Sequence, residues 1–316
     1  MSTSTTTSFV CALAWLWSVQ AQPPCEPRAG LLVPDLVTNH LLDLITLIEV
    51  TREDNPTSAS LPPRFESMNV FEDSNDCAIV ARAKSSNTCM AVFQATDFGN
   101  PFDIVQLLDG RTDTVEGCSF RAGIASAYFS SYHKDFVAAV DACMATNKMG
   151  ATPKLLLGGH SQGGAISVAA SVDLHRYEPT TVTIGAVRSL ISPCNMTVST
   201  NHYRFVNAIE GKYDFWPTVF NRKGMHIGQP IYLDPTSRRG HQASYTYLDD
   251  NSNPEPTDSF NHDPDIYWLS ISQLFHENLA DYCQDELVVD GWDTGHRCNA
   301  GPECSSRKCA QSSCQA

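Results

Sequence analysis

Residues 155–170, LLLGGHSQGGAISVAA, place a single serine between glycines where an apolar run gives way to a run of small residues. The apolar run is typical of a short buried strand, and the small residues are typical of a helix. In a G-x-S-x-G turn between a strand and a helix, the serine hydroxyl is exposed and can attack an electrophile. We therefore interpret Ser161 as a nucleophile, with a glycine-rich turn that carries no chemistry as the alternative. The amide of Gln162 then lies at a helix N-terminus, where it can bind an oxyanion.

A nucleophilic serine needs a base to accept its proton and a carboxylate to orient that base. After such a turn the chain order is serine, acid, histidine, so both partners are expected beyond residue 161. The stretch AIEGKYDFWPTVF offers Glu210 and Asp214 as the acid. The histidines that follow the acid are His226, His241, His262, His276 and His296.

The elements around these residues alternate between strand and helix patterns. Residues 34–50 and 122–146 have helical apolar spacing, and 165–176 continue as a helix after the serine. The strand patterns are CAIVARA and CMAVFQAT, joined by the turn KSSN, and then KLLLG, TVTIGAV, HYRFVNAI and HIGQPIYLD. This alternation predicts an α/β fold with a mostly parallel central sheet flanked by helices.

The 316 residues are enough for one large catalytic domain and a small appendage. The formal charge of −14 disfavours nucleic acid as a partner. Residues 1–21 read as a signal peptide, because their apolar stretch is too short to span a bilayer and Val19 and Ala21 suit cleavage. No other stretch predicts stable membrane insertion. The chain is therefore expected to be secreted, which would make Asn195 a glycosylation site.

Twelve cysteines also favour an oxidising compartment. Loss of Cys11 with the signal peptide would leave eleven, so one cysteine would be free or would pair outside the chain. Residues 286–316 carry four closely spaced cysteines and almost no large apolar side chain, which predicts a small disulfide-rich tail. No C-x2-C pair occurs in the tail, and we expect no metal site.

The segment GHSQGGAIS resembles GHSLGGALA of the class 3 lipase family, in the α/β-hydrolase superfamily. Further segments resemble that family in the same order: AVFQAT is similar to its FRGT, RAGIASAY to HxGFxxAY, TIGAVR to TFGxPR, NHYRFVN to YRxVN, and HIGQPIYLD to HxGxEIWxD. These matches cover roughly residues 75–285. The sequence departs from the family pattern at Gln94, Ala95, Gln162 and Val187.

The resemblance implies roles for particular residues. It implies that the amide of Thr96 is the second oxyanion donor, beside Gln162. It favours Asp214 as the acid, because DFWP matches the family's D-x-x-P, while counting from Arg204 would favour Glu210. It favours His276 as the base, in an HxxY-like stretch near the domain end with Cys283 soon after, and His262 is the alternative. His160 is expected to be structural. No cofactor is implied.

The resemblance also places a lid over the site in residues 97–114. Its apolar residues indicate a lipid surface, although they could instead pack on the core. We therefore expect three segments: a signal peptide (1–21), a class 3 lipase-like α/β-hydrolase domain (22–285) and a cysteine-rich tail (286–316). The predicted protein is a secreted serine hydrolase of carboxylic esters, most simply a triacylglycerol lipase that meets its lipid or ester substrate at an interface. A feruloyl-type esterase, a phospholipase and a binding protein with weakened catalysis are the alternatives.

Overall fold

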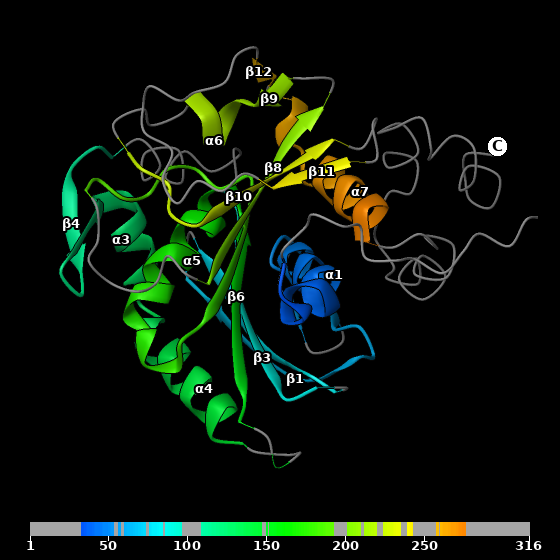
Figure 1. The fold of residues 1–316 in the computed structure, drawn as a ribbon. Helices are drawn as coiled ribbons and strands as arrows, with labels where there is room; N and C mark the ends of the chain where they lie inside the picture. The colour runs from blue at the N-terminus through cyan, green and yellow to red at the C-terminus, as the bar shows by residue number, and fades with distance from the viewer. Residues whose placement is uncertain are drawn as a thin grey trace, which may run out of the picture.

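The computed structural model describes residues 33–53, 56–57, 60–73, 76–84, 86–96, 109–146, 150, 152–192, 201–209, 212–219, 224–234, 239–242, 257–258 and 260–275. In these residues a ten-stranded sheet forms the centre of the molecule (Figure 1). Its main path, in spatial order, consists of β1 (Phe65–Glu72), β2 (Cys77–Ala83), β3 (Thr88–Phe93), β6 (Lys154–His160), β7 (Thr180–Ile184), β8 (His202–Ile209), β10 (Gln229–Asp234) and β11 (Arg239–Gln242). Two short strands, β9 (Lys212–Asp214) and β12 (Thr257–Asp258), pair with each other, and β9 also pairs with β8.

The centre of the sheet is parallel. Strands β3, β6, β7, β8 and β10 run in the same direction, while β1, β2 and β11 are antiparallel to their neighbours. The predicted α/β fold with a mostly parallel sheet is therefore confirmed. Because parallel strands end at the same edge, the residues that follow β3 and β6 lie close together, and ligand sites in such sheets form at this edge.

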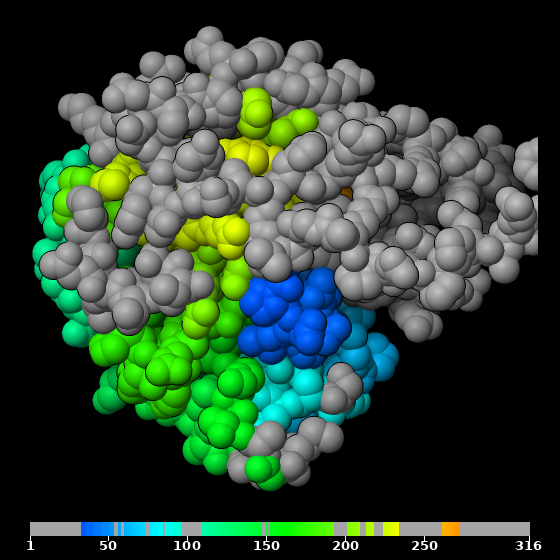
Figure 2. Space-filling view, in the orientation of Figure 1, coloured from blue at the N-terminus to red at the C-terminus, as the bar shows by residue number. Residues whose placement is uncertain are grey.

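Helices cover both faces of the sheet. α1 (Asp35–Val50) and α7 (Pro264–Phe275) lie on one face, and α3 (Ala122–Tyr128), α4 (His133–Ala145) and α5 (Ser161–Asp173) lie on the other (Figure 1). Strand β6 is therefore apolar on both sides: Leu155 and Leu157 join the core under α5, and Leu156 joins the core under α1. In Figure 2 the outer surface of α1 (blue) borders the N-terminal strands (cyan) on one face of the molecule.

Some elements differ from those predicted. The helical pattern of residues 122–146 forms two helices, α3 and α4, which are separated at residues 129–132. Ser130 and Ser131 lie in this break, and serine favours turns because its hydroxyl competes for backbone hydrogen bonds. Helix α5 begins at Ser161 itself rather than at residue 165. Strand β1 and the hairpin of β4 (Thr112–Val115) and β5 (Cys118–Arg121) were not predicted.

The described cysteines are in different states. Cys89 and Cys143 form a disulfide. Cys118 is also disulfide-bonded. Cys77 is free and buried, and its burial, followed by Glu72 and Asp76, raises the pKa of its thiol to about 12. The predicted signal peptide, Asn195 and the cysteine-rich tail lie outside the described residues. Within the described residues, no helix has both the length and the apolar character needed to cross a membrane.

Candidate active site

Ser161 lies in a strained turn between β6 and α5. Its φ of 55° is in the left-handed region, which residues with a side chain rarely adopt. The glycines around it are required by close backbone contacts. A Cβ on Gly159 would lie 2.2 Å from the backbone carbon of Gly163, and a Cβ on Gly163 would lie 2.2 Å from the carbonyl oxygen of Phe93. The sequence GHSQGG therefore folds into a turn that fixes the serine at the carboxyl end of β6 and tight against β3.

An imidazole joins Ser161 to a carboxylate. His262 Nε2 lies 2.9 Å from Ser161 Oγ, and His262 Nδ1 lies 2.8 Å from Asp214 Oδ2. Asp214 ends β9, and His262 ends the short 3-10 helix η4 (Phe260–His262). All three residues are buried. The serine hydroxyl, imidazole and carboxylate thus form one hydrogen-bonded row, the arrangement that activates a serine for nucleophilic attack.

The imidazole of this row does not belong to the histidine that the sequence favoured. His276 lies outside the described residues, and the ring between Ser161 and Asp214 is that of His262, the alternative. The preference for His276 depended on a local HxxY-like spacing, whereas β9 and η4 are brought together by pairing of β9 with β12. Of the two acid candidates, Asp214 contacts the imidazole, and Glu210 lies outside the described residues.

Among the residues that the structure describes, two groups besides His262 donate hydrogen bonds to the Asp214 carboxylate. The backbone amide of Trp216, in α6 (Phe215–Val219), donates to Oδ1 at 2.9 Å. The phenol of Tyr267, on α7, donates to Oδ2 at 2.7 Å and accepts a bond from the amide of Asn207 at 3.0 Å. Burial, followed by the nearby Asp214, raises the pKa of Tyr267 well above its usual value, so the phenol stays a donor. These bonds fix the carboxylate in the orientation that His262 requires.

The backbone and ring of His262 are also held in place. His160 Nε2 donates to the carbonyl oxygen of His262 at 3.0 Å, and the two rings lie 4.7 Å apart between centroids. Burial, followed by repulsion from His262, lowers the pKa of His160 well below its usual value, so His160 stays neutral. The indole of Trp216 lies 5.6 Å from the His262 ring, and Asn207 Nδ2 donates to the carbonyl of Asn261 at 2.8 Å. His160 therefore acts through the backbone, as a structural residue, and not on the serine.

The two residues expected to supply oxyanion donors lie side by side. Thr96 follows β3, and its hydroxyl donates to Gln162 Oε1 at 2.8 Å. Gln162 is the second residue of α5, in the first turn, where backbone amides have no partner within the helix. The bond between Thr96 and Gln162 fastens the end of β3 to the start of α5, beside Ser161.

The structure describes only a small part of the expected lid. Most of the expected lid, residues 97–108, lies outside the described residues, and the rest leads into β4. No group of three or more possible metal ligands occurs within the described part of the chain. Tyr267 and Trp216 also contact Asp214 or His262, and no role was predicted for either residue from the sequence. Trp216 stands two residues after Asp214, in the same DFWP segment, and this adjacency was the available signal. Tyr267 had none, because it reaches Asp214 from a different element.

No protein-family model and no curated protein sequence matches this chain. Solved structures do match. A triacylglyceride lipase of Rhizomucor miehei aligns over 77% of this chain and 98% of its own, at 20% identity and a TM-score of 0.56. Lipase II from Rhizopus niveus aligns over 73% and 94%, at 19% identity and a TM-score of 0.56. A lipase from Rhizopus microsporus var. chinensis aligns over 73% and 87%, at 17% identity and a TM-score of 0.57. The chain has the α/β-hydrolase fold of these fungal lipases.

Proposed function

We propose that this protein is a serine hydrolase of carboxylic esters, and that Ser161, His262 and Asp214 are its catalytic triad. The observation that carries the proposal is the His262 imidazole, which lies within hydrogen-bonding distance of both the serine hydroxyl and a buried carboxylate. The fold supports the proposal, because the matched structures are described as lipases and one of them as a triacylglycerol lipase with a serine protease triad.

In the proposed reaction, Ser161 Oγ attacks the ester carbonyl while His262 Nε2 accepts the hydroxyl proton. Asp214 stabilises the imidazolium that forms, and Tyr267 and the amide of Trp216 keep the carboxylate in place. The backbone amides of Thr96 and Gln162 bind the tetrahedral oxyanion, and one such donor is worth roughly a hundredfold to a thousandfold in kcat. His262 then protonates the departing alkoxide. Water attacks the acyl-enzyme by the same route and releases the acid.

We further propose that the substrate is an acylglycerol presented at a lipid surface, and that the protein is secreted. The apolar residues of 97–108 and the matched lipases support this substrate, and the cysteine content and the sequence of residues 1–21 support secretion. The division at residues 21 and 285 remains a prediction. The cross-linking of the cysteine-rich tail by disulfides is also a prediction. We further predict that the reaction needs no cofactor and that the protein does not bind nucleic acid.

A substrate panel with the purified protein tests the proposal. Hydrolysis of a triolein emulsion is compared with hydrolysis of phosphatidylcholine, soluble short-chain esters and methyl ferulate, for the wild type and for Ser161→Ala. We expect the highest rate on the emulsion, a rise in rate when a soluble ester passes its solubility limit, and no activity in the variant. Preference for ferulate or phospholipid would change the substrate class but keep the triad. Equal activity of wild type and variant on every ester would refute the proposed function.

A further inference from the structure

The two cysteines of the disulfide between Cys89 and Cys143 differ in their exposure to solvent. Cys89 is in β3 and is fully buried, whereas Cys143 is half-buried near the end of α4. Beside α4, a cavity of about 280 Å³ is lined by Cys143 together with Arg82, Glu66, Ser67, Asn69 and Thr146. Cys89 does not line it. A small molecule in this cavity would therefore lie against Cys143 and not against Cys89.

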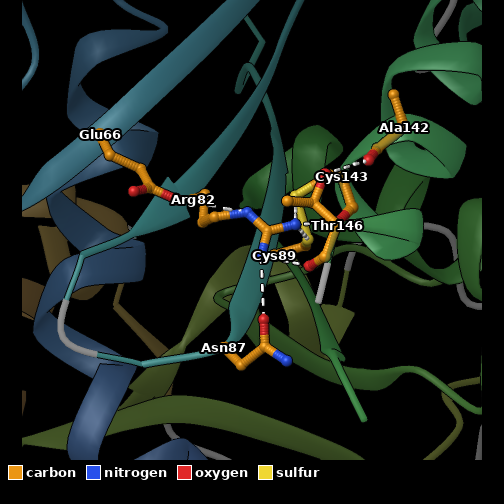
Figure 3. The surroundings of a disulfide bond; sticks show 7 residues. All are labelled: Glu66, Arg82, Asn87, Cys89, Ala142, Cys143 and Thr146. Atoms are coloured by element: carbon orange, nitrogen blue, oxygen red, sulfur yellow. Dashed lines mark hydrogen bonds and ion pairs between the residues drawn. A yellow bond between two sulfur atoms is a disulfide. The ribbon is translucent and has the colours of Figure 1, made fainter. Parts of the chain in front are cut away.

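A buried guanidinium lies against both sulfur atoms (Figure 3). Arg82, on β2, is only 3% exposed, and its Nη2 lies 3.4 Å from Cys89 Sγ and 3.5 Å from Cys143 Sγ. The same nitrogen donates to the carbonyl oxygen of Cys143, and Nη1 donates to the carbonyl oxygen of Thr146 at 3.0 Å. The side chain of Asn87 also accepts from Nη1, at 2.9 Å.

Only one carboxylate is paired with this guanidinium among the described residues. Glu66 Oε1 lies 3.5 Å from Arg82 Nε, on the side of the guanidinium away from the sulfur atoms (Figure 3). Among the described residues, the nitrogen that faces the sulfur atoms, Nη2, also donates to the carbonyl oxygen of Cys143, which carries no net charge. A thiolate formed at either cysteine would thus be next to a fixed positive charge, which favours the thiolate over the thiol.

We propose that Cys143 is a site of reversible S-thiolation by small monothiols of the glutathione class, with Arg82 promoting the exchange. The incoming thiolate enters the cavity and attacks Cys143 Sγ. The bond between Cys143 and Cys89 breaks, its electron pair goes to Cys89 Sγ, and a mixed disulfide remains on Cys143. The negative charge of the attacking thiolate ends on Cys89, beside Arg82. In the reverse step the Cys89 thiolate attacks Cys143 Sγ, expels the small thiolate and restores the bond.

The guanidinium controls the rate because a thiolate that is better stabilised leaves faster. Arg82 also holds two carbonyl groups at the end of α4, and a purely structural role would have the opposite consequence. If Arg82 only held the helix end in place, its removal would loosen α4 and speed the reduction of the disulfide. If Arg82 stabilises the departing thiolate, its removal slows the exchange even though the helix end is looser.

The test exposes the folded, oxidised protein to reduced glutathione, traps free thiols with iodoacetamide at timed intervals, and maps adducts by mass spectrometry. We expect glutathione on Cys143 and alkylation on Cys89. Arg82→Met should slow adduct formation about fivefold, and Glu66→Gln, which leaves the guanidinium unopposed, should speed it. Arg111→Met removes an exposed arginine that is paired with Asp109 and should leave the rate unchanged. Adducts at Cys118 serve as the internal reference.

The same measurement in denaturant separates the folded environment from intrinsic reactivity, because the variants should then react at equal rates. A faster reaction of folded Arg82→Met, an adduct on Cys89, or absence of any adduct on Cys143 would overturn the proposal. If Arg82→Met does not fold, Glu66→Gln and Arg82→Lys decide: the proposal requires acceleration in the first and a rate close to wild type in the second. These outcomes are independent of the ester hydrolysis proposed above.

Discussion

At the scale of single residues, some side chains of the candidate site can be identified from the residues beside them in the sequence, and others cannot. Ser161 and Asp214 lie in short segments whose flanking residues suit their positions, GHSQGG and DFWP. The proposed base has no comparable sequence pattern beside it, because five histidines follow Asp214 and the sequence alone does not show which of them lies next to Ser161. His262 reaches Ser161 from 101 residues away in sequence. Local spacing favoured His276, which lies outside the described residues, whereas the imidazole that contacts Ser161 and Asp214 is that of His262.

Tyr267 provides the sharpest residue-scale prediction. Tyr267→Phe removes the hydroxyl that donates to Asp214 Oδ2 and leaves the ring in place, so we expect kcat to fall about tenfold and KM to stay near the wild-type value. Steady-state kinetics on a soluble ester measure both. Tyr177→Phe is the matched control, because Tyr177 also donates to a carboxylate, Asp141, on a different element. Equal effects in the two variants would contradict a positioning role for Tyr267.

At the scale of elements, the sequence predicted the parts that carry a strong apolar pattern. Helix α1 and strands β2, β3, β6, β7 and β8 occur at or close to their expected positions, because they are buried and their apolar residues are continuous or periodic. Strand β1 was missed. It lies at the sheet edge, and most of its side chains are partly or fully exposed, so burial imposes little pattern on it.

The contact between β3 and α5 gives an element-scale prediction. A methyl group at position 163 would lie 2.2 Å from the Phe93 carbonyl oxygen and 2.5 Å from that of Gln94, so Gly163→Ala must push the end of β3 away from α5. Because Thr96 follows that end, we expect a loss of about 2 kcal/mol or more in the free energy of unfolding and a drop of at least tenfold in kcat.

Gly110→Ala is the control for this variant, since a methyl group there would meet only the tip of Arg121, at 3.7 Å. Urea denaturation and ester hydrolysis, measured on both variants, provide the comparison. Wild-type activity in Gly163→Ala would show that the spacing of β3 and α5 does not determine the position of the proposed oxyanion donors.

At the scale of the whole molecule, buried histidines make the fold sensitive to acid. Burial is the main cause that lowers the pKa of His160, His202 and His226, to about 3 for His202, and His226 is also repelled by Arg204 and Arg188. In the unfolded chain each titrates near pH 6.5. Below that pH the unfolded state binds more protons than the folded state, so stability is present above about pH 6.5 and is lost as the pH falls toward about 3.

Each of these histidines lowers the free energy of unfolding by about 1.4 kcal/mol per pH unit in this range, and the three together by at most about 4 kcal/mol per unit. Urea denaturation at pH values between 7 and 5 measures this slope. His202→Asn should reduce this slope by about 1.4 kcal/mol per pH unit, which corresponds to one proton, whatever its effect on stability at pH 7. A slope that is equal in wild type and variant would mean that His202 is protonated in the folded protein.

Active-site labelling tests the central claim, that His262 is the base for Ser161. The wild type, His262→Ala and His276→Ala are treated with a fluorophosphonate, and the rate of labelling at Ser161 is followed by peptide mapping. We predict labelling of Ser161 in the wild type, an unchanged rate in His276→Ala, and a rate lower by about a thousandfold in His262→Ala. Rapid labelling of His262→Ala together with loss of labelling in His276→Ala would contradict the account.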